Sequence, residues 1–380
     1  MMFLLKQAIL PIKCKYKIPT KQYLDQGKYP VIDQGQEFIG GYTNDEAGVI
    51  SQLPVIVFGD HTRVFKYVDF PFVAGADGVK IFQAKSCLLP KLLFYFLQAV
   101  TLPDRGYARH YQYLVKSMIP VPPLAEQKKI VKKIEEFFGV IDAQVKRLEA
   151  TQEALVSYRQ SILSDCLKNA TGISTTLGKI VKPRRERVSF DGTNGHIIFI
   201  GMDCIEPNAL KPHKTDLLEN TKSTCFVFHK DDVLYGRMRS YLNKVFKAET
   251  NGAASAEFIV FPPTDTILSD YLKYLLHQQD FVSFATRNAS GDRPRVKFEE
   301  DLAPFPFTLP SLSEQKAIVK KIETAFAFAD KAQAAITDTL EQAKQLKQSI
   351  LKRAFEGKFV PQDPNDKPVD LTQLKKDKQK

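Results

Sequence analysis

The sequence contains the same helix start twice, and this repeat constrains the fold more than any other feature. The stretch PPLAEQKKIVKKIEEFF begins at Pro122, and PSLSEQKAIVKKIETAF begins at Pro310. Aligned without a gap, residues 122–163 and 310–351 are identical at 19 of 42 positions, mostly at the two ends. Both copies predict a long helix, because proline precedes each start and the interior has no Gly or Pro apart from Gly139.

Each copy also carries an apolar residue at every seventh position, in the same register. These residues are Ile134, Ile141, Leu148, Leu155 and Ile162 in the first copy, and Ile322, Ala329, Ile336, Ala343 and Ile350 in the second. Such a period forms a seam that requires a partner helix, so we predict an intramolecular two-helix coiled coil with helices roughly 60 Å long. The alternative is that each helix covers its own domain's core. Ser311-x-x-Glu314 adds a predicted capping box to the second copy.

The composition describes a folded chain with a polyanionic partner. With 380 residues, 44% of them hydrophobic and 26% charged, the chain is long enough for two domains of usual size. Its net charge of +11 and pI of about 9.2 favour nucleic acid or an anionic membrane surface. No stretch approaches the roughly 18 apolar residues of a membrane span, and the apolar start is broken by Lys6 and Gln7. Nucleic acid is therefore predicted, and a membrane is not.

The cysteines predict a cytoplasmic protein with reduced thiols. They are five in number, and none of them forms a C-x-x-C pair: Cys14, Cys87, Cys166, Cys204 and Cys225. An odd number without paired spacing fits neither a disulfide framework nor a zinc site.

The repeated helices separate two long blocks of a different texture. Both blocks have short runs rich in Val, Ile, Phe and Tyr between turn signals, which is typical of mixed domains of short strands with a few helices. IVFGD at 56–60 resembles VLYGR at 233–237, so the blocks are predicted to share a fold. The predicted segments are a first block at 1–121, a helical spacer at 122–170, a second block at 171–309, a second spacer at 310–357 and a tail at 358–380.

Basic and aromatic residues alternate in two clusters of each block, as a DNA-binding face requires. The predicted DNA-binding residues are His61, Arg63, Lys66, Arg105, Tyr107, Arg109, His110 and Tyr111 in the first block, and Arg237, Arg239, Tyr241, Asn243, Lys244, Arg287, Arg293, Arg295 and Lys297 in the second. Arg and Lys neutralise phosphates, and Arg and Asn also read base edges. One such cluster is more often a solvated surface, but four at corresponding places in a basic chain favour an interface.

The sequence lacks the motifs of catalysis. It has no target-base tetrapeptide of an adenine or cytosine methyltransferase, no phosphate-binding G-x-x-x-x-G-K-(S/T), no G-x-S-x-G and no H-E-x-x-H. Asp104 followed by Glu126-Gln127-Lys128 matches the spelling of metal-dependent nucleases. A helix start explains Glu126 better, because its twin Glu314 has no matching Pro-Asp upstream. We therefore predict no catalytic residue and no metal site.

The order of these segments resembles a known family. A variable block, a helix opening PPLAEQ, a second variable block and a helix ending QSILKRAFEGKFVPQDPND together resemble the specificity subunit of type I restriction–modification enzymes. RMRSYLNKV at 237–245 and SAEF at 255–258 are also similar to recurrent text of that family. The resemblance implies an α+β fold with a pseudo-twofold repeat, in which two mixed α/β target recognition domains are separated by two long antiparallel helices.

The resemblance also implies the function and partners of the chain. Each recognition domain would read one half of a bipartite, asymmetric site in double-stranded DNA, and the helices would fix the gap between the halves. Two modification (methyltransferase) subunits would bring S-adenosylmethionine, and two restriction subunits that use ATP and Mg could join. The chain itself would carry no cofactor and would not be an enzyme.

Three alternatives stay open from the residues alone. The chain could serve a system with fused methylase and nuclease, it could be a self-contained PD-(D/E)xK nuclease, or it could be a coiled-coil scaffold without a DNA role. Only the last of these predicts the absence of any sequence preference in DNA binding.

Overall fold

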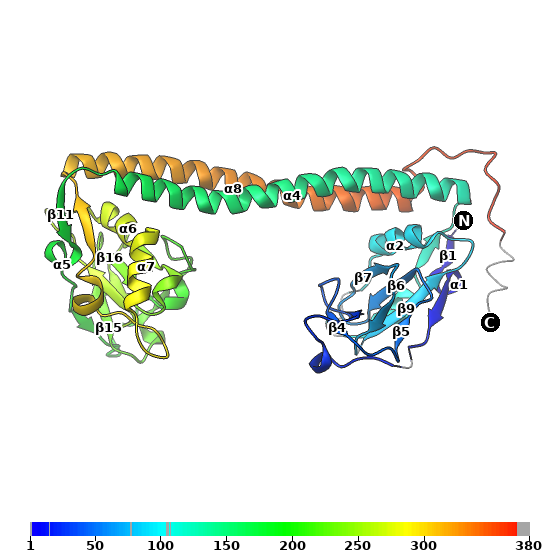
Figure 1. Ribbon diagram of the computed structural model, residues 1–380, viewed down its shortest axis with the longest axis horizontal. Coiled ribbons are helices and arrows are strands. Elements are labelled where there is room, and N and C mark those ends of the chain that lie inside the picture. The colour runs from blue at the N-terminus through cyan, green and yellow to red at the C-terminus, as the bar shows by residue number, and fades with distance from the viewer. Residues whose placement is uncertain (1, 15, 77, 104–105, 107, 371–380) are drawn as a thin grey trace. The chain divides into compact units, whose positions relative to one another are not determined.

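The computed structural model describes residues 2–14, 16–76, 78–103, 106 and 108–370 and divides the chain into two compact units. Unit 1 is Met1–Leu148 with Asp338–Lys380, and unit 2 is Glu149–Thr337. The long helices α4 (Leu124–Lys168) and α8 (Leu312–Phe355) each contribute residues to both units (Figure 1). Each unit is therefore built from one block of short strands and a part of each helix.

Unit 1 is a pair of twisted sheets under a helix. Its elements are β1 (Met2–Leu4), α1 (Leu5–Ala8), β2 (Ile9–Ile12), β3 (Tyr29–Ile32), β4 (Gly41–Thr43), β5 (Val49–Ile50), β6 (Val55–Gly59), β7 (Phe65–Val68), β8 (Phe72–Ala74), β9 (Val79–Ala84), α2 (Pro90–Ala99), α3 (Tyr111–Leu114) and β10 (Met118–Pro120). The sheets have the orders β2-β9-β6-β7 and β4-β3-β8-β5, and β1 pairs separately with β10. All five residues of β6 are buried, because both faces of the strand are covered. Ile56 and Phe58 belong to the core that contains α2, whereas Val55 and Val57 belong to the core that contains residues of β3 and β8.

Unit 2 repeats this arrangement with different side chains. Its elements are β11 (Ile173–Thr176), α5 (Leu177–Ile180), β12 (Arg187–Val188), β13 (Ile198–Ile200), β14 (Asp216–Leu217), β15 (Cys225–Phe228), β16 (Val233–Gly236), β17 (Val245–Lys247), β18 (Gly252–Ala254), β19 (Phe258–Phe261), α6 (Ser269–His277), α7 (Gln279–Asn288) and β20 (Pro306–Leu309). The sheets have the orders β17-β16-β19 and β12-β15-β18-β13-β14, with β11 paired to β20.

The central strands of the two units correspond, although the two sheets have four strands each in unit 1 and three and five strands in unit 2. In unit 1 the parallel pair β3–β8 has antiparallel neighbours β4 and β5, and in unit 2 the parallel pair β13–β18 has antiparallel neighbours β14 and β15. The hairpin β6–β7 corresponds to β16–β17, and α2 and α6 cover equivalent strands. The predicted α+β fold class and the shared fold of the two blocks are confirmed.

The apolar seam lies between α4 and α8 in both units. In unit 1, Lys347 of α8 forms an ion pair with Asp142 of α4, and in unit 2 Arg159 of α4 pairs with Asp330 of α8 at 2.6 Å. The two pairs occur in opposite order along the two helices, so the helices are antiparallel. Six seam residues are buried, namely Ile134, Ile141, Ile322, Ala329, Ile336 and Ile350. The other four, Leu148, Leu155, Ile162 and Ala343, are half-buried.

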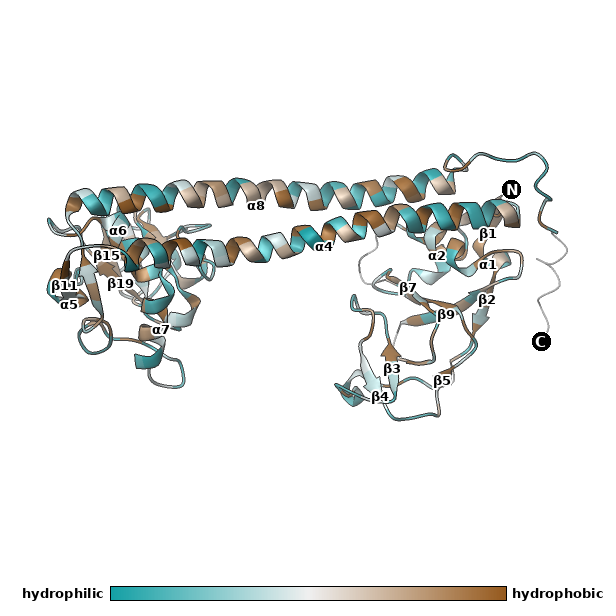
Figure 2. Ribbon diagram, turned by 45° about the horizontal axis from the view of Figure 1, so that its top comes forward, coloured by the Kyte–Doolittle hydropathy of each residue, from teal (hydrophilic) through white to brown (hydrophobic). Residues whose placement is uncertain are grey.

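Apolar residues recur along both long helices between hydrophilic ones (Figure 2). This alternation follows from the seven-residue period, since only one stripe of each helix meets its partner. Among the described residues, no helix combines the length and the hydropathy that a membrane crossing requires.

The ends of α8 show how its sequence sets its limits. The Oγ of Ser311 accepts a hydrogen bond from the Glu314 N–H at 3.3 Å, which confirms half of the predicted capping box. The Glu314 carboxylate accepts from the Thr171 N–H at 3.0 Å, which ties the segment just before β11 to the helix start. At the other end Gly357 has φ +70, a left-handed conformation that stops a helix at low cost in glycine.

We expect Ile134→Ala to lower the free energy of unfolding by about 2–4 kcal/mol, because the Ile134 side chain is fully buried in the unit 1 core. Val140→Ala is the matched control on the same helix. Val140 is 64% exposed, so its loss should cost less than about 0.5 kcal/mol. Guanidinium denaturation followed by circular dichroism measures both, and equal costs would contradict the seam.

Candidate nucleic-acid interface

The two basic clusters of unit 1 meet at the end of β6. Asp60 follows the last residue of β6, and its carbonyl accepts a hydrogen bond from the His110 N–H at 2.9 Å. The buried Asp60 carboxylate also accepts from the Tyr111 N–H at 2.7 Å. Residues 60–63 and 108–111, which are far apart in the sequence, are therefore held side by side.

The two basic clusters of unit 2 meet at the equivalent place. Arg237 follows the last residue of β16, and its carbonyl accepts a hydrogen bond from the Val296 N–H at 3.0 Å. The Arg239 N–H donates to the Pro294 carbonyl at 2.8 Å, and Met238 and Arg295 form an isolated β-bridge. The segments 237–244 and 289–297 are thereby joined into one surface.

Asp60 and Arg237, which follow β6 and β16, make equivalent backbone hydrogen bonds through their N–H and carbonyl groups. The Asp60 N–H donates to the Gly78 carbonyl at 2.6 Å, and the Arg237 N–H donates to the Glu257 carbonyl at 2.8 Å. The carbonyls of the same two residues accept from His110 and Val296 as described above. The backbone of the candidate interface is thus repeated, whereas its side chains are not.

Several predicted DNA-binding residues are exposed on these segments. They are Arg63 and Arg109 in unit 1, and Arg239, Tyr241, Arg287, Arg293, Arg295 and Lys297 in unit 2. Arg295 forms a bidentate ion pair with Glu257, with distances of 2.6 and 3.1 Å, and Lys297 pairs with Glu300. Among the described residues, the structure shows no ion pair for Arg239 or Arg293, so their charge is available to a phosphate.

Arg63 and Arg239 have left-handed backbones, with φ of 63° and 53°. This conformation is uncommon for residues other than glycine and carries a conformational cost that the surrounding packing must offset. In both units it occurs in the turn that follows the first strand of the hairpin. The turn therefore presents an arginine from an unusual backbone in each candidate interface.

Three predicted DNA-binding residues are buried, which removes them from any contact with DNA. Lys66 is 4% exposed, His110 0% and Asn243 2%. The His110 Nδ1 lies 3.0 Å from the Asp60 carbonyl oxygen, and the Asn243 Nδ2 donates to the His277 carbonyl at 2.9 Å. Both side chains hold loops together.

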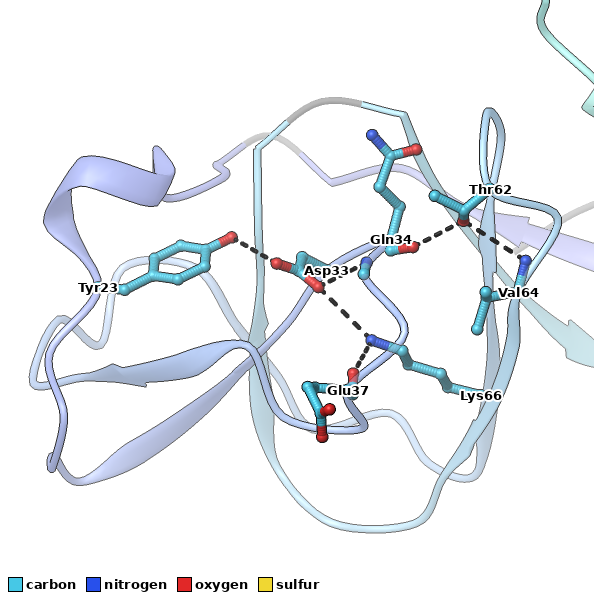
Figure 3. Close-up of polar contacts among 8 residues, drawn as sticks. Tyr23, Asp33, Gln34, Glu37, Thr62, Val64 and Lys66 are labelled. Carbon is cyan, nitrogen blue, oxygen red and sulfur yellow. Dashed lines mark hydrogen bonds and ion pairs between the residues drawn. The ribbon is translucent and has the colours of Figure 1, made fainter. Parts of the chain in front are cut away.

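Lys66 has an internal partner (Figure 3). Its ammonium donates to the Glu37 carbonyl and lies 3.5 Å from the Asp33 Oδ1. Burial lowers the pKa of Lys66, although the Asp33 carboxylate acts in the opposite direction. A DNA phosphate cannot reach this charge without unfolding the loop above it.

The remaining predicted residues are half-buried or lie outside the described residues. The half-buried group is His61, Tyr111, Arg237 and Lys244, and the undescribed pair is Arg105 and Tyr107. The Lys244 Nζ donates to the Met202 carbonyl at 2.8 Å. The Nε atom of Arg237 is buried and has no acceptor among the described residues.

A third segment joins the interface of unit 1, and the sequence did not predict it. The loop after β3, residues 33–40, is tied to the hairpin turn: the Thr62 Oγ donates to the Gln34 carbonyl at 2.6 Å, beside the Lys66 contacts (Figure 3). Phe38 of this loop is 45% exposed. Gln34 and Gln36, which flank Gly35 after β3, were the feature of the sequence that could have indicated this loop. Polar residues on a loop often bind a ligand such as DNA.

The nuclease alternative finds no support in the geometry. Glu126 is 5% exposed. Burial raises the pKa of its carboxyl group, and the negative charge of the nearby Asp366 adds to this effect. Asp104 lies outside the described residues. Within the described part of the chain, no group of three or more His, Cys, Asp or Glu side chains could hold a metal ion.

Comparison with known proteins identifies the family. The profile described as "Type I restriction modification DNA specificity domain" matches residues 7–151 and 178–342. The chain therefore belongs to the type I restriction–modification DNA specificity family, whose members are non-catalytic DNA-recognition subunits. The match covers both copies of the fold, and it supports neither the nuclease nor the scaffold alternative.

Individual relatives agree with this assignment. The chain is 25% identical to the EcoR124I/EcoR124II specificity subunit of Escherichia coli over 341 residues, which cover 81% of this chain and 82% of that protein. It is 26% identical to the StySPI specificity subunit of Salmonella potsdam over 268 residues, which cover 64% and 58%.

Solved structures share the fold. A chain from a study of complex assembly and conformational transition in a type I restriction–modification system gives a TM-score of 0.69 at 18% identity, covering 94% of this chain and 98% of that one. The HsdS subunit from Thermoanaerobacter tengcongensis gives a TM-score of 0.51 at 18% identity, covering 94% and 97%.

We expect acidification to lower the free energy of unfolding of unit 2 through the His277 imidazole. The backbone carbonyl of the same residue holds Asn243. Burial, followed by the positive charge of Lys273, lowers the pKa of His277 to about 4 from an ordinary 6.5. Above pH 6.5 the imidazole is neutral in both states and contributes nothing. Between pH 6.5 and 4 only the unfolded state takes up the proton, so stability falls, by about 2 kcal/mol at pH 5.

His277→Gln removes this titration and should flatten that part of the pH dependence. Urea denaturation at pH 7 and pH 5 measures the difference between the two proteins. If wild type and variant lose the same stability on acidification, His277 is not the responsible group.

Proposed function

We propose that this chain is the DNA-reading subunit of a type I restriction–modification complex, with residues 1–121 and 171–309 each reading one half of a bipartite, asymmetric site. One observation carries the proposal. The backbone hydrogen bonds of Asp60 and Arg237 that join the basic segments are the same in both units, whereas the exposed side chains on those segments differ apart from the arginine in each turn. A repeated scaffold with different side chains suits two half-sites of different sequence.

The exposed residues suit both kinds of DNA contact. Arginines bind phosphates, which supplies affinity that falls with salt, and they also bind guanine edges in the major groove, which supplies discrimination. Tyr241 is 52% exposed on the same segment as Arg239 and offers an aromatic surface to a sugar or base. The net charge of +11 favours the encounter with DNA.

The two long helices act as the spacer in this proposal. Each helix contributes to both units, and neither contains a proline in its interior. A continuous helix pair joined by a buried seam resists bending, so it would hold the gap between the half-sites at a set length. This is the reason for repeating the helices while varying the blocks.

The proposal includes the partners. The family membership supports a complex of this chain with DNA and with other subunits of a restriction–modification system. The finer assignment is two modification subunits that carry S-adenosylmethionine and two restriction subunits that use ATP and Mg, with no cofactor on this chain and a cytoplasmic location. The pseudo-twofold repeat favours this stoichiometry, because it offers one partner two equivalent sites.

We expect Arg239→Ala and Arg293→Ala to weaken DNA binding through one half-site only. An arginine that bonds a base gives about 1–3 kcal/mol of discrimination at that position, and one that bonds a phosphate reduces the salt slope by about one ion. Binding selection from a random duplex library, repeated at two salt concentrations, measures both effects. Lys331→Ala is the control, since this exposed residue lies on α8 away from the basic segments. Loss of both half-sites, or of neither, would contradict the assignment of these arginines.

We expect the helix length to set the gap. Inserting one seven-residue repeat into α4 and one into α8 at facing positions preserves the seam and lengthens the spacer by roughly 10 Å, about three base pairs. The selected half-sites should be unchanged and the gap longer. An insertion of equal length in the exposed loop at 191–194 is the control. An unchanged gap would rule out the spacer role, and the absence of any selected sequence would favour the scaffold alternative.

A further inference from the structure

Each copy of the repeat places one glutamine in the interior. Gln127 and Gln315 occupy the same position in the two helix starts, and both side chains are 0% exposed. A buried primary amide offers two donors and an acceptor, all of which are costly to leave without partners. The structure satisfies each of these groups in both copies.

In unit 1, Gln127 joins three backbone groups from two segments. Its Oε1 accepts a hydrogen bond from the Leu89 N–H at 2.8 Å. Its Nε2 donates to the Cys87 carbonyl at 2.9 Å and to the Pro122 carbonyl at 2.8 Å. Cys87 and Leu89 lie just before α2, whereas Pro122 lies just before α4.

In unit 2, Gln315 makes the same three contacts. Its Oε1 accepts from the Leu268 N–H at 2.8 Å, and its Nε2 donates to the carbonyls of Thr266 at 3.0 Å and Pro310 at 2.9 Å. Thr266 and Leu268 lie just before α6. This set of three hydrogen bonds to one glutamine, here called the bracket, therefore recurs at an equivalent place with distances that agree within 0.1 Å.

The bracket holds the start of α2 from the first turn of α4, and the start of α6 from the first turn of α8. Leu89 and Leu268 are the N-cap residues of α2 and α6, and neither can cap its helix with its own side chain. The N-terminal N–H groups of a helix need acceptors from elsewhere. Gln127 and Gln315 supply one of these acceptors, so the end of α2 or α6 is fixed to the start of α4 or α8.

This joint lies between the parts with different roles in the proposed function. The helix α2 packs against β6 and β7, and α6 packs against β16 and β17, which are the hairpins that carry the candidate interfaces. The angle between the hairpin and the long helix in each unit therefore depends on the bracket. Apolar packing alone would allow sliding, whereas three directional bonds to one planar amide do not.

We propose that Gln127 and Gln315 are positioning residues that lock each recognition domain to the first turn of its spacer helix, and so set the gap at which both half-sites can be bound together. This inference rests on the proposed function. It assigns the glutamine of the repeated EQK text a role in geometry rather than in DNA contact, since neither side chain reaches the surface.

The test uses the full chain in complex with its modification partner and a duplex library in which the gap between the selected half-sites is varied. Gln127→Met keeps the volume and removes all three bonds. We expect the half-site sequences to be retained, the affinity at the best gap to fall roughly tenfold, and neighbouring gap lengths to become nearly as good. Gln315→Met should do the same from the other end.

Gln160→Met is the matched control. Gln160 lies on the same helix as Gln127 and is half-buried as a residue. Its buried Oε1 has no partner in the described part of the chain, so its loss should leave gap selectivity unchanged. A merely structural glutamine would lower the denaturation midpoint without broadening the gap preference. Retained gap selectivity in Gln127→Met and Gln315→Met would overturn the inference.

Two further measurements keep the test decisive. If the wild-type complex selects no bipartite site, the proposed function fails, and the positioning role fails because it rests on that function. If the wild type selects a bipartite site and both variants keep its gap selectivity, only the positioning role fails. If the variants do not fold, hydrogen exchange of the wild-type chain decides, because the bracket predicts that the Leu89 and Leu268 amides exchange as slowly as core amides. Fast exchange at these two amides would overturn the lock.

Discussion

The apolar seam between α4 and α8 is the constraint on which both units depend, because each unit contains a part of each helix. Ile134 and Ile350 are buried in one core cluster of unit 1, and Ile322 is buried in unit 2 with Leu163 of the other helix. In unit 1 this burial joins the beginning of α4 to the end of α8, which are far apart in the sequence. The seam therefore closes each unit, and the sheets pack against the paired helices.

The backbone arrangement of the two units is repeated, whereas most of their exposed side chains are not. The strand topology, the hydrogen bonds around Asp60 and Arg237, and the brackets of Gln127 and Gln315 recur in both units. The exposed residues on the joined segments do not recur, apart from one arginine in each hairpin turn, Arg63 and Arg239. This separation fits a DNA-recognition subunit, because equivalent partners require repeated geometry, whereas two different half-sites require different side chains.

Sequence reasoning was most successful where the interaction is local or periodic. The helix starts and the seven-residue seam follow from spacing and from the repeat, since a helix presents residues at fixed intervals whatever surrounds it. The family and its fold class follow from the resemblance of the segments to known specificity subunits. It was least successful for the basic residues. Lys66, His110 and Asn243 have the composition of a DNA-binding cluster, but each turned inward to satisfy a backbone carbonyl or a carboxylate.

The sequence by itself thus determined the two long helices, their pairing, the mixed character of the two blocks and, through the family resemblance, the class of protein. Only the tertiary structure decided which basic residues are exposed, that the loop at 33–40 joins the hairpin turn, and that one glutamine of each repeat is a bracket and not a surface residue. The physical reason is that burial and hydrogen-bond partners depend on segments distant in the chain. Thr62 meets Gln34, and Gln127 meets Leu89, only after the sheets and helices have packed.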